Sequence, residues 1–97
     1  MIEVTYDGET ELTVAGHAGA GDPGKDLVCA AVTALTLALG ESAARSSAEP
    51  GFAKLSGGNK EIYEAFARGY GLLAKFFPDN VHLRCLNNEK EQNDGRK

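Results

Sequence analysis

Hydrophobic and polar residues alternate along two short segments near the start of the chain, residues 1–6 and 11–16. A period of two residues predicts half-buried strands, with one face in the core and the other in solvent. The Asp7-Gly8 pair between the segments is typical of a tight turn, so a β-hairpin is expected. The inward positions of this hairpin are Ile2, Val4, Tyr6, Leu12 and Val14.

The next apolar segment, residues 26–45, has the composition of a buried helix. Its apolar residues cover nearly the whole circumference, and Asp26 at its start is a natural N-cap. The glycines ahead of it, with Pro23, predict an irregular loop. Small side chains on the helix would allow close approach of a sheet or of a second subunit. The loop glycines are Gly16, Gly19, Gly21 and Gly24, and the small helix residues are Ala30, Ala31, Ala34 and Ala38.

The second half of the chain predicts two further strands and one helix. Residues 46–51 are expected to turn the chain into a short strand at 52–55. Asn59 is the expected N-cap of a helix over residues 60–77, which Pro78 ends. The apolar stripe of this helix is Ile62, Phe66, Tyr70, Leu73 and Phe77, and the final strand alternates Val81, Leu83 and Cys85.

These elements predict one small two-layer α+β domain over residues 1–86. The order ββαβαβ corresponds to a mostly antiparallel four-stranded sheet with two helices packed on it. Residues 87–97 contain no apolar side chain and are expected to form a disordered polar tail. A domain of this size buries only about 60–65% of the surface that its unfolded chain exposes, so dimerisation would add stability.

Charge and composition narrow the function classes. The net charge is −4 and the ten Lys and Arg are scattered, so no basic stripe is available to bind nucleic acid directly. The first residues lack the cationic start and apolar core of a signal peptide, and no apolar run approaches the roughly 20 residues of a membrane span. A cytoplasmic protein is therefore expected, with its two cysteines reduced.

His17 and Cys29 are candidates for chemistry, and a zinc site is one interpretation of them. The chain has two histidines and two cysteines, enough in number for such a site. His82 and Cys85, however, are three residues apart on a predicted strand and would point to opposite faces of the sheet. They would not complete one tetrahedron, so the sequence indicates neither a metal site nor a cofactor.

A nucleophilic cysteine is the second interpretation. With Asp26 as the cap, Cys29 falls in the first helical turn, where unpaired N–H groups favour the thiolate and Lys25 adds positive charge. His17, at a strand end across the glycine loop, could act as general base and later as general acid. The third interpretation is a small core cysteine in an alanine-rich helix, and the spacing alone leaves these alternatives open.

The segment from Gly16 to Ala31 resembles the signature of the ribosomal-processing cysteine protease family. Its members share Gly-His-Ala at the end of the second strand and Gly-x-Asp-hydrophobic-Val-Cys-Ala-Ala at the helix start. The predicted order of elements is also similar to that family's small α/β fold, over about residues 1–86. The matching positions are Gly16, His17, Ala18, Gly24, Asp26, Val28, Cys29, Ala30 and Ala31.

The resemblance implies a homodimeric cytoplasmic cysteine endopeptidase. Members of the family remove the N-terminal extension of large-subunit ribosomal protein twenty-seven, cutting after an aromatic residue. Carried over to this sequence, Cys29 would be the nucleophile, His17 the base and Asp26 the third motif residue. Asp26 would cap the helix or orient the histidine ring, and the sequence does not separate these two roles.

Two departures from the family pattern concern the substrate pocket. Thr33 stands where the family commonly has serine, and no aromatic residue lies near Ala20. The glycine-rich loop is expected to order over a bound peptide. The rival function is a non-catalytic ribosome-assembly module that binds the same ribosomal protein precursor. A thiol oxidoreductase is disfavoured, because no resolving cysteine lies nearby in the sequence.

Overall fold

The computed structural model describes residues 1–16 and 23–86, and the side chains of the first helix from Leu27 onward. The predicted polar tail, residues 87–97, lies outside the described residues. Within them the elements follow the order ββαββαβ. These elements are β1 (Ile2–Tyr6), β2 (Glu11–Gly16), α1 (Pro23–Ser42), β3 (Arg45–Glu49), β4 (Phe52–Ser56), α2 (Lys60–Phe76) and β5 (Val81–Cys85).

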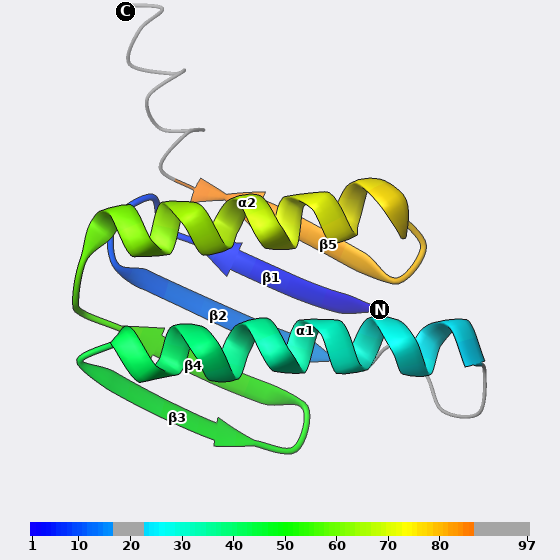
Figure 1. Cartoon of the computed structure of the whole chain (residues 1–97), viewed down its shortest axis with the longest axis horizontal. Coiled ribbons are helices and arrows are strands. Elements are labelled where there is room, and N and C mark those ends of the chain that lie inside the picture. The colour runs from blue at the N-terminus through cyan, green and yellow to red at the C-terminus, as the bar shows by residue number, and fades with distance from the viewer. Residues whose placement is uncertain (17–22, 87–97) are drawn as a thin grey trace, which may run out of the picture.

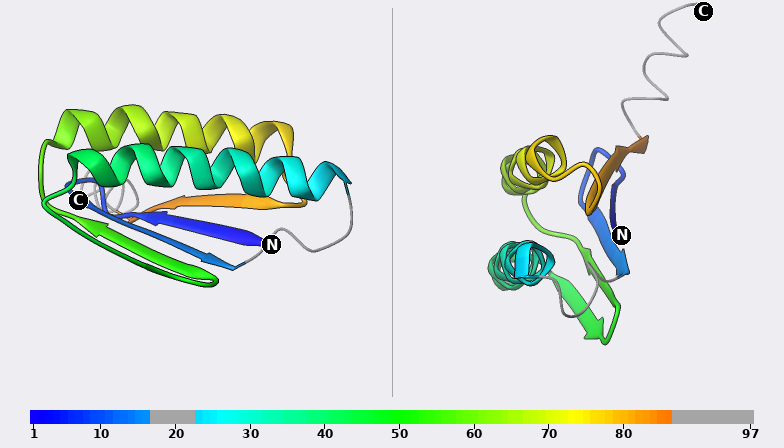
Figure 2. Two further views of the ribbon diagram at one scale, coloured as in Figure 1. Left: turned by 60° about the horizontal axis from the view of Figure 1, so that its bottom comes forward. Right: turned by 90° about the vertical axis from the view of Figure 1, so that its right-hand side faces the viewer.

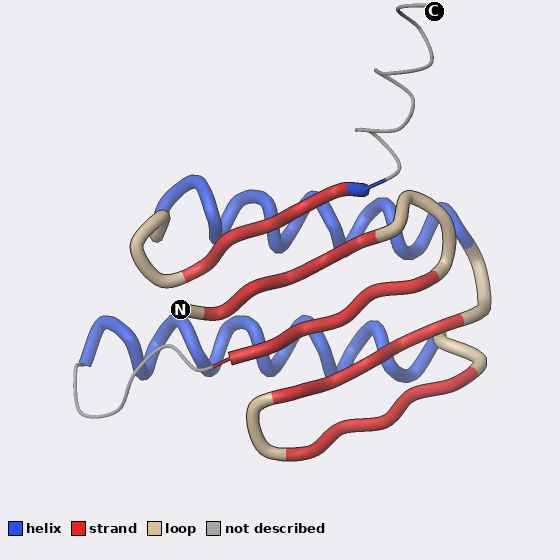
Figure 3. The backbone as a smooth tube through the Cα atoms, turned by 180° about the vertical axis from the view of Figure 1, so that it is seen from behind, coloured by secondary structure: helices blue, strands red, loops and turns tan. Residues whose placement is uncertain are grey.

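The strands form a five-stranded sheet in the order β3-β4-β2-β1-β5 (Figure 1). Neighbouring strands are antiparallel except β1 and β5, which run parallel. The two helices lie side by side in opposite directions on one face of the sheet (Figure 2). Seen from behind, the other face carries no helix of the described residues (Figure 3). The two-layer α+β prediction is confirmed, with one strand more than predicted.

The N-terminal hairpin forms as predicted. Val4 lies opposite Val14 in the antiparallel pair of β1 and β2, so alternate residues of both strands face the helices. The turn is held by Asp7, whose Oδ1 accepts the backbone N–H of Glu9 at 2.7 Å and that of Glu11 at 3.1 Å. Aspartate is favoured at the start of a turn because its carboxylate can accept backbone N–H groups that have no backbone acceptor there.

The prediction that residues 46–51 only turn the chain is wrong, because Arg45–Glu49 form the edge strand β3. β3 pairs with β4 in a second hairpin, whose turn is Pro50-Gly51. Proline suits the first central position of a type II turn and glycine the second, where Gly51 has φ of +82°. All five residues of β3 are exposed, so the strand has no hydrophobic alternation by which to recognise it.

The helix α1 starts and ends earlier in the chain than predicted. It begins at Pro23, whose ring fixes φ near the helical value and which therefore suits the first helical position. Asp26 is then the fourth residue of the helix, so the prediction that it is the N-cap is wrong. Gly24 likewise belongs to α1 and not to the predicted loop, and the helix stops at Ser42.

The helix α2 begins where it was predicted to begin. The side chain of Asn59 accepts the backbone N–H of Glu61 at 2.7 Å, which confirms the N-cap. The cap satisfies one of the first N–H groups of the helix, which have no partner inside it. No helix in the described residues is both long and apolar enough to cross a membrane.

The core lies between the sheet and the inner sides of both helices. Tyr70 of the predicted stripe is fully buried, whereas Phe77 follows the end of α2 and is exposed. Tyr63 is also fully buried although it lies outside the stripe, and its ring stacks on that of Tyr6 with centroids 6.3 Å apart. The other stripe positions, which are partly buried against the core, are Ile62, Phe66 and Leu73.

Candidate active site

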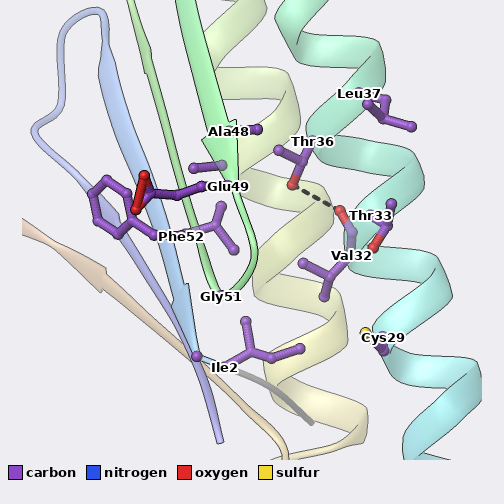
Figure 4. A pocket seen from close by; sticks show the side chains of 13 residues that line it. Ile2, Cys29, Val32, Thr33, Thr36, Leu37, Ala48, Glu49, Gly51 and Phe52 are labelled. Carbon is purple, nitrogen blue, oxygen red and sulfur yellow. Dashed lines mark hydrogen bonds between the residues drawn. The ribbon is translucent and has the colours of Figure 1, made fainter.

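Cys29 lines a cavity of about 280 Å³ between α1 and the β3–β4 hairpin (Figure 4). The side chain of Cys29 is partly buried, with its sulfur turned toward the cavity. Pockets for small-molecule ligands commonly measure about 300–1,000 Å³. This cavity lies just below that range, which is enough for a single large side chain of a peptide.

One wall of the cavity is a face of α1. Cys29, Val32, Thr33 and Thr36 all line it. Residues three, four and seven positions apart lie on the same side of a helix, so the spacing itself brings these side chains together. Leu37 lies at the outer edge of this wall and is mostly exposed. The helix therefore presents two hydroxyl groups and the thiol to an otherwise apolar space.

The opposite wall is the end of the sheet. Ile2 and Ala53 are buried there, and Ala48 faces the same way because it pairs with Ala53. Glu49 and Phe52 are the next cross-strand pair, and their side chains point away from α1 (Figure 4). Glu49 is the one lining residue with a carboxylate or a basic group, and its side chain points away, so no charged side chain of the described residues faces the thiol from this wall.

Thr36 connects the cavity wall to α2. Its Oγ1 lies 2.8 Å from the carbonyl oxygen of Val32, to which it donates, and 2.9 Å from the hydroxyl of Tyr70, which donates to it. Tyr70 is fully buried, and burial raises the pKa of its phenol. The phenol therefore stays neutral and holds the two helices in fixed register at the cavity wall.

Gly16 lines the cavity where the chain leaves β2. Its N–H donates to the carbonyl oxygen of Gly51 at 2.8 Å, which ties this strand end to the β3–β4 turn. The backbone has φ of +99°, and a Cβ at this position would collide with the carbonyl oxygen of Met1. The glycine of the Gly-His-Ala motif is therefore required by the backbone itself.

The predicted site residues separate into three groups. Gly16, Cys29 and Thr33 come together around the cavity. Asp26 and Gly24 lie at the start of α1, where the structure describes only the backbone. The rest of the set lies outside the described residues, namely His17, Gly19 and Gly21.

The predicted position of Cys29 in the first helical turn is wrong. Because α1 begins at Pro23, Cys29 is the seventh residue of the helix and lies in its second turn. The unpaired N–H groups of a helix belong to its first four positions. The argument that the helix start activates the thiol therefore does not hold, and what the structure shows of Cys29 is its place on the cavity wall.

The C-terminal strand keeps His82 and Cys85 apart, as predicted. His82 is exposed, and its Nδ1 lies 3.0 Å from the carboxylate of Glu3 on the face without helices. Cys85 alternates to the other face and packs against the core. Among the described residues no group of three or more His, Cys, Asp and Glu is placed to hold a metal ion.

The sequence alone did not identify Thr36, Leu37 or the β3–β4 hairpin as part of the site. The signal for the first two was present, because they follow Cys29 by seven and eight residues on a helix. The hairpin carried no such signal, since its contribution depends on the pairing of β3 with β4 and on Gly51 meeting Gly16.

Comparison with known families identifies one match. The family model of the cysteine protease Prp matches residues 1–92. The match takes in all described elements and both members of the predicted Cys-His pair. Comparison with curated protein sequences finds no match.

Solved structures share the fold. The Streptococcus mutans protein SMU.848 is 28% identical, with a TM-score of 0.74, over 89% of this chain and 94% of its own. A ribosomal processing protease Prp from S. aureus, with a covalently linked product peptide, is 18% identical with a TM-score of 0.69. The same protease with a substrate peptide is 17% identical with a TM-score of 0.68. Both cover 87% of this chain and 96% of their own, and at these identities the likeness concerns the fold.

Proposed function

This chain belongs to the family of the cysteine protease Prp, and we propose that it removes the N-terminal extension of a large-subunit ribosomal protein, protein twenty-seven, in the cytoplasm. The observation that carries the proposal is Cys29 on the wall of an apolar cavity. His17 follows directly after Gly16, which lines the same cavity, so the chain order supports a Cys29–His17 dyad. The peptide complexes of the S. aureus ribosomal processing protease support the substrate class.

The dyad cleaves by nucleophilic catalysis. His17 takes the proton of the Cys29 thiol, and the sulfur attacks the scissile carbonyl carbon to form a tetrahedral intermediate. The carbon–nitrogen bond breaks as His17 gives its proton to the leaving amine, which leaves a thioester on Cys29. Water, deprotonated by His17, then attacks the thioester and releases the carboxylate product and the free thiol.

Asp26 and Thr33 support the dyad in this proposal. We propose that the Asp26 carboxylate orients the His17 ring, because the N-cap role does not fit a helix that begins at Pro23. Thr33 lies one helical turn after Cys29 on the same wall, where its hydroxyl adds a hydrogen-bonding group beside the thiol. Its methyl group makes that wall more apolar than the serine of the family would.

The cavity suits the residue before the cleaved bond. Its walls are apolar apart from the thiol and two threonine hydroxyls, and no charged side chain of the described residues faces inward. An aromatic side chain would bury a large apolar area in such a space at little cost in desolvation. This chemistry supports cleavage after an aromatic residue, as the resemblance implied.

Cleavage of the extended ribosomal precursor tests the proposal. Cys29→Ala is expected to lower kcat/KM by at least about 1,000-fold, because the nucleophile is lost. Cys85→Ala is the matched control, since the other cysteine packs against the core, and it should cut within a few-fold of wild type. Mass spectrometry of the product N-terminus reads both results. Equal cutting by Cys29→Ala, or binding of the precursor by wild type without any cut, would instead support a non-catalytic assembly module.

A homodimer is part of the same proposal. The chain is small, and a second copy would cover surface that a domain of this size leaves exposed.

A further inference from the structure

The outer side of the edge strand β3 is open to a further strand. β3 stands last in the sheet, and no strand of the described residues lies beyond it (Figure 3). All five of its residues are exposed, and its register with β4 is regular along its whole length. Unpaired backbone groups are therefore what this side of the sheet offers to another molecule.

Two hydrogen bonds at the ends of β4 show which backbone groups of β3 are unpaired. The N–H of Gly16 in β2 donates to the carbonyl oxygen of Gly51 at 2.8 Å. The N–H of Gly57 donates to the carbonyl oxygen of Thr10 at 2.8 Å. Because backbone groups along a strand alternate between its two neighbours, the odd-numbered residues from 51 to 57 bond toward β2. The even-numbered residues between them bond toward β3.

The residues of β3 that pair with these even-numbered residues are Arg45, Ser47 and Glu49. Ser46 and Ala48 alternate with them, so their N–H and C=O groups point to the open side of the sheet. Proteins commonly protect such an edge with a proline, a bulge or central charges, and β3 has none of these. Its charged residues stand at its two ends, with small residues between them. An extended polypeptide segment can pair with an edge of this kind through its backbone.

Ala48 belongs both to this edge and to the cavity at Cys29 (Figure 4). Leu37 lines the same cavity from α1, and both residues are exposed, which marks the open side of the cavity between α1 and β3. Neighbouring residues of paired strands point to the same face of a sheet. A residue that pairs beside Ala48 would therefore direct its side chain into the cavity that Cys29 lines.

We propose that an extended segment of the substrate adds to β3 as a sixth strand, with one side chain in the cavity at Cys29. The backbone would supply affinity, and the cavity would select the one side chain. A second copy of β3 would offer this cavity of about 280 Å³ only the small side chains of Ser46 and Ala48. A foreign segment with a large apolar residue fills the space better, and it rests on the proposed function because that function supplies such a segment.

A peptide with single N-methyl groups tests the strand pairing. The probe is a fluorescent peptide that spans the cleaved bond of the extended ribosomal precursor, and Cys29→Ala holds it uncut. N-methylation at two positions that are two residues apart should each raise Kd at least about threefold, since a backbone hydrogen bond is lost. N-methylation of the residue between them should leave Kd within about twofold. A uniform effect along the peptide, or none, would overturn the pairing.

A proline in β3 tests the same contact from the side of the protein. Ser46→Pro removes an N–H that points to the open side, and edge strands tolerate proline at such positions. Ser46→Ala loses the same hydroxyl but keeps the N–H, so the proline variant should have a KM at least about threefold above that of the alanine variant. Circular dichroism and the rate at which iodoacetamide alkylates Cys29 should agree between the two variants. Equal KM values in two folded variants would contradict the role of this edge, and if the proline variant does not fold, the N-methyl peptides decide.

The outcomes separate this contact from the proposed function. If wild type cuts the precursor and neither test shows an effect, the function stands and the contact at β3 is wrong. If the peptide binds with the alternating pattern but wild type cuts nothing, the contact stands and proteolysis fails. If wild type neither binds nor cuts the precursor, both fail together. A Ser46→Pro variant that changes the sedimentation mass but not the peptide Kd would assign the edge to a second copy and overturn the proposal.

Discussion

Gly16 joins the sheet to the candidate dyad, and its backbone leaves no room for a side chain. We expect Gly16→Ala to lower the free energy of unfolding by about 1–3 kcal/mol, because φ of +99° strains an alanine and its Cβ would meet the Met1 carbonyl. Urea denaturation measures the change. Gly40→Ala in α1 is the control, since the added Cβ would lie an ordinary 3.7 Å from the Leu55 side chain of β4, and it should stabilise by up to about 1 kcal/mol. Equal denaturation midpoints for the two variants would contradict this account.

The positions of site residues were predictable from the sequence where the residues that meet lie close together in the chain. Cys29 and Thr33 lie one helical turn apart, so the sequence placed them together, and the cavity confirms that they share a wall. The Thr36–Tyr70 bond joins residues 34 positions apart, and no local pattern reveals which phenol meets which hydroxyl. Asp26 was assigned as the cap because aspartate favours that position, but Pro23 starts the helix earlier.

The start of α2 depends on one side chain, Asn59. We expect Asn59→Ala to cost about 1 kcal/mol, which corresponds to a fall in Tm of roughly 4–8 °C for a domain of this size. Asn59→Asp keeps an acceptor for the Glu61 N–H and should retain most of the stability. Calorimetry compares the variants. If Asn59→Asp lowered Tm as much as Asn59→Ala does, a capping role for this side chain would be contradicted.

Secondary-structure elements were predictable where an apolar period marks them. The helix α2 and four of the five strands carry such a period, and α1 is recognisable by its continuous apolar segment. The order of these elements along the chain follows from the patterns, whereas the pairing of β2 with β4 and of β1 with β5 does not. β3 does not, because it is an edge strand that buries none of its five residues. Its presence depends on tertiary pairing with β4, which sequence periodicity does not report. The same limit applies to the cavity, whose second wall includes that hairpin.

The whole molecule has two faces with different chemistry. The sheet face without helices carries polar contacts, such as the Lys54–Glu11 ion pair at 3.6 Å and the His82–Glu3 hydrogen bond at 3.0 Å. The helix layer instead exposes large apolar side chains, namely Leu27 and Leu37 on α1 and Leu72 and Phe76 on α2. The cavity with Cys29 lies between these layers, because α1 forms one of its walls and the sheet with the β3–β4 hairpin forms the other.

The three tyrosines of the core predict a loss of folding stability at high pH, because all three have raised pKa values. Burial, with the nearby charge of Glu64 and other acids, raises the pKa of Tyr6 to about 12. Burial and the charges of Asp7 and Glu11 raise the pKa of Tyr63, and burial raises that of Tyr70.

An unfolded chain loses these phenolic protons near pH 10, whereas the folded one retains them. Stability is therefore intact below pH 10 and falls as the pH rises above it. For Tyr6 the fall continues toward pH 12, at up to about 1.4 kcal/mol per pH unit, and Tyr63 and Tyr70 add losses of the same sign. In a spectroscopic titration, tyrosinate absorbance should rise only together with the loss of circular dichroism, and the chain in urea should titrate near pH 10. Tyrosinate formation near pH 10 with the fold intact would show that the three hydroxyls are not held by Glu9, Gly57 and Thr36 as the structure has them.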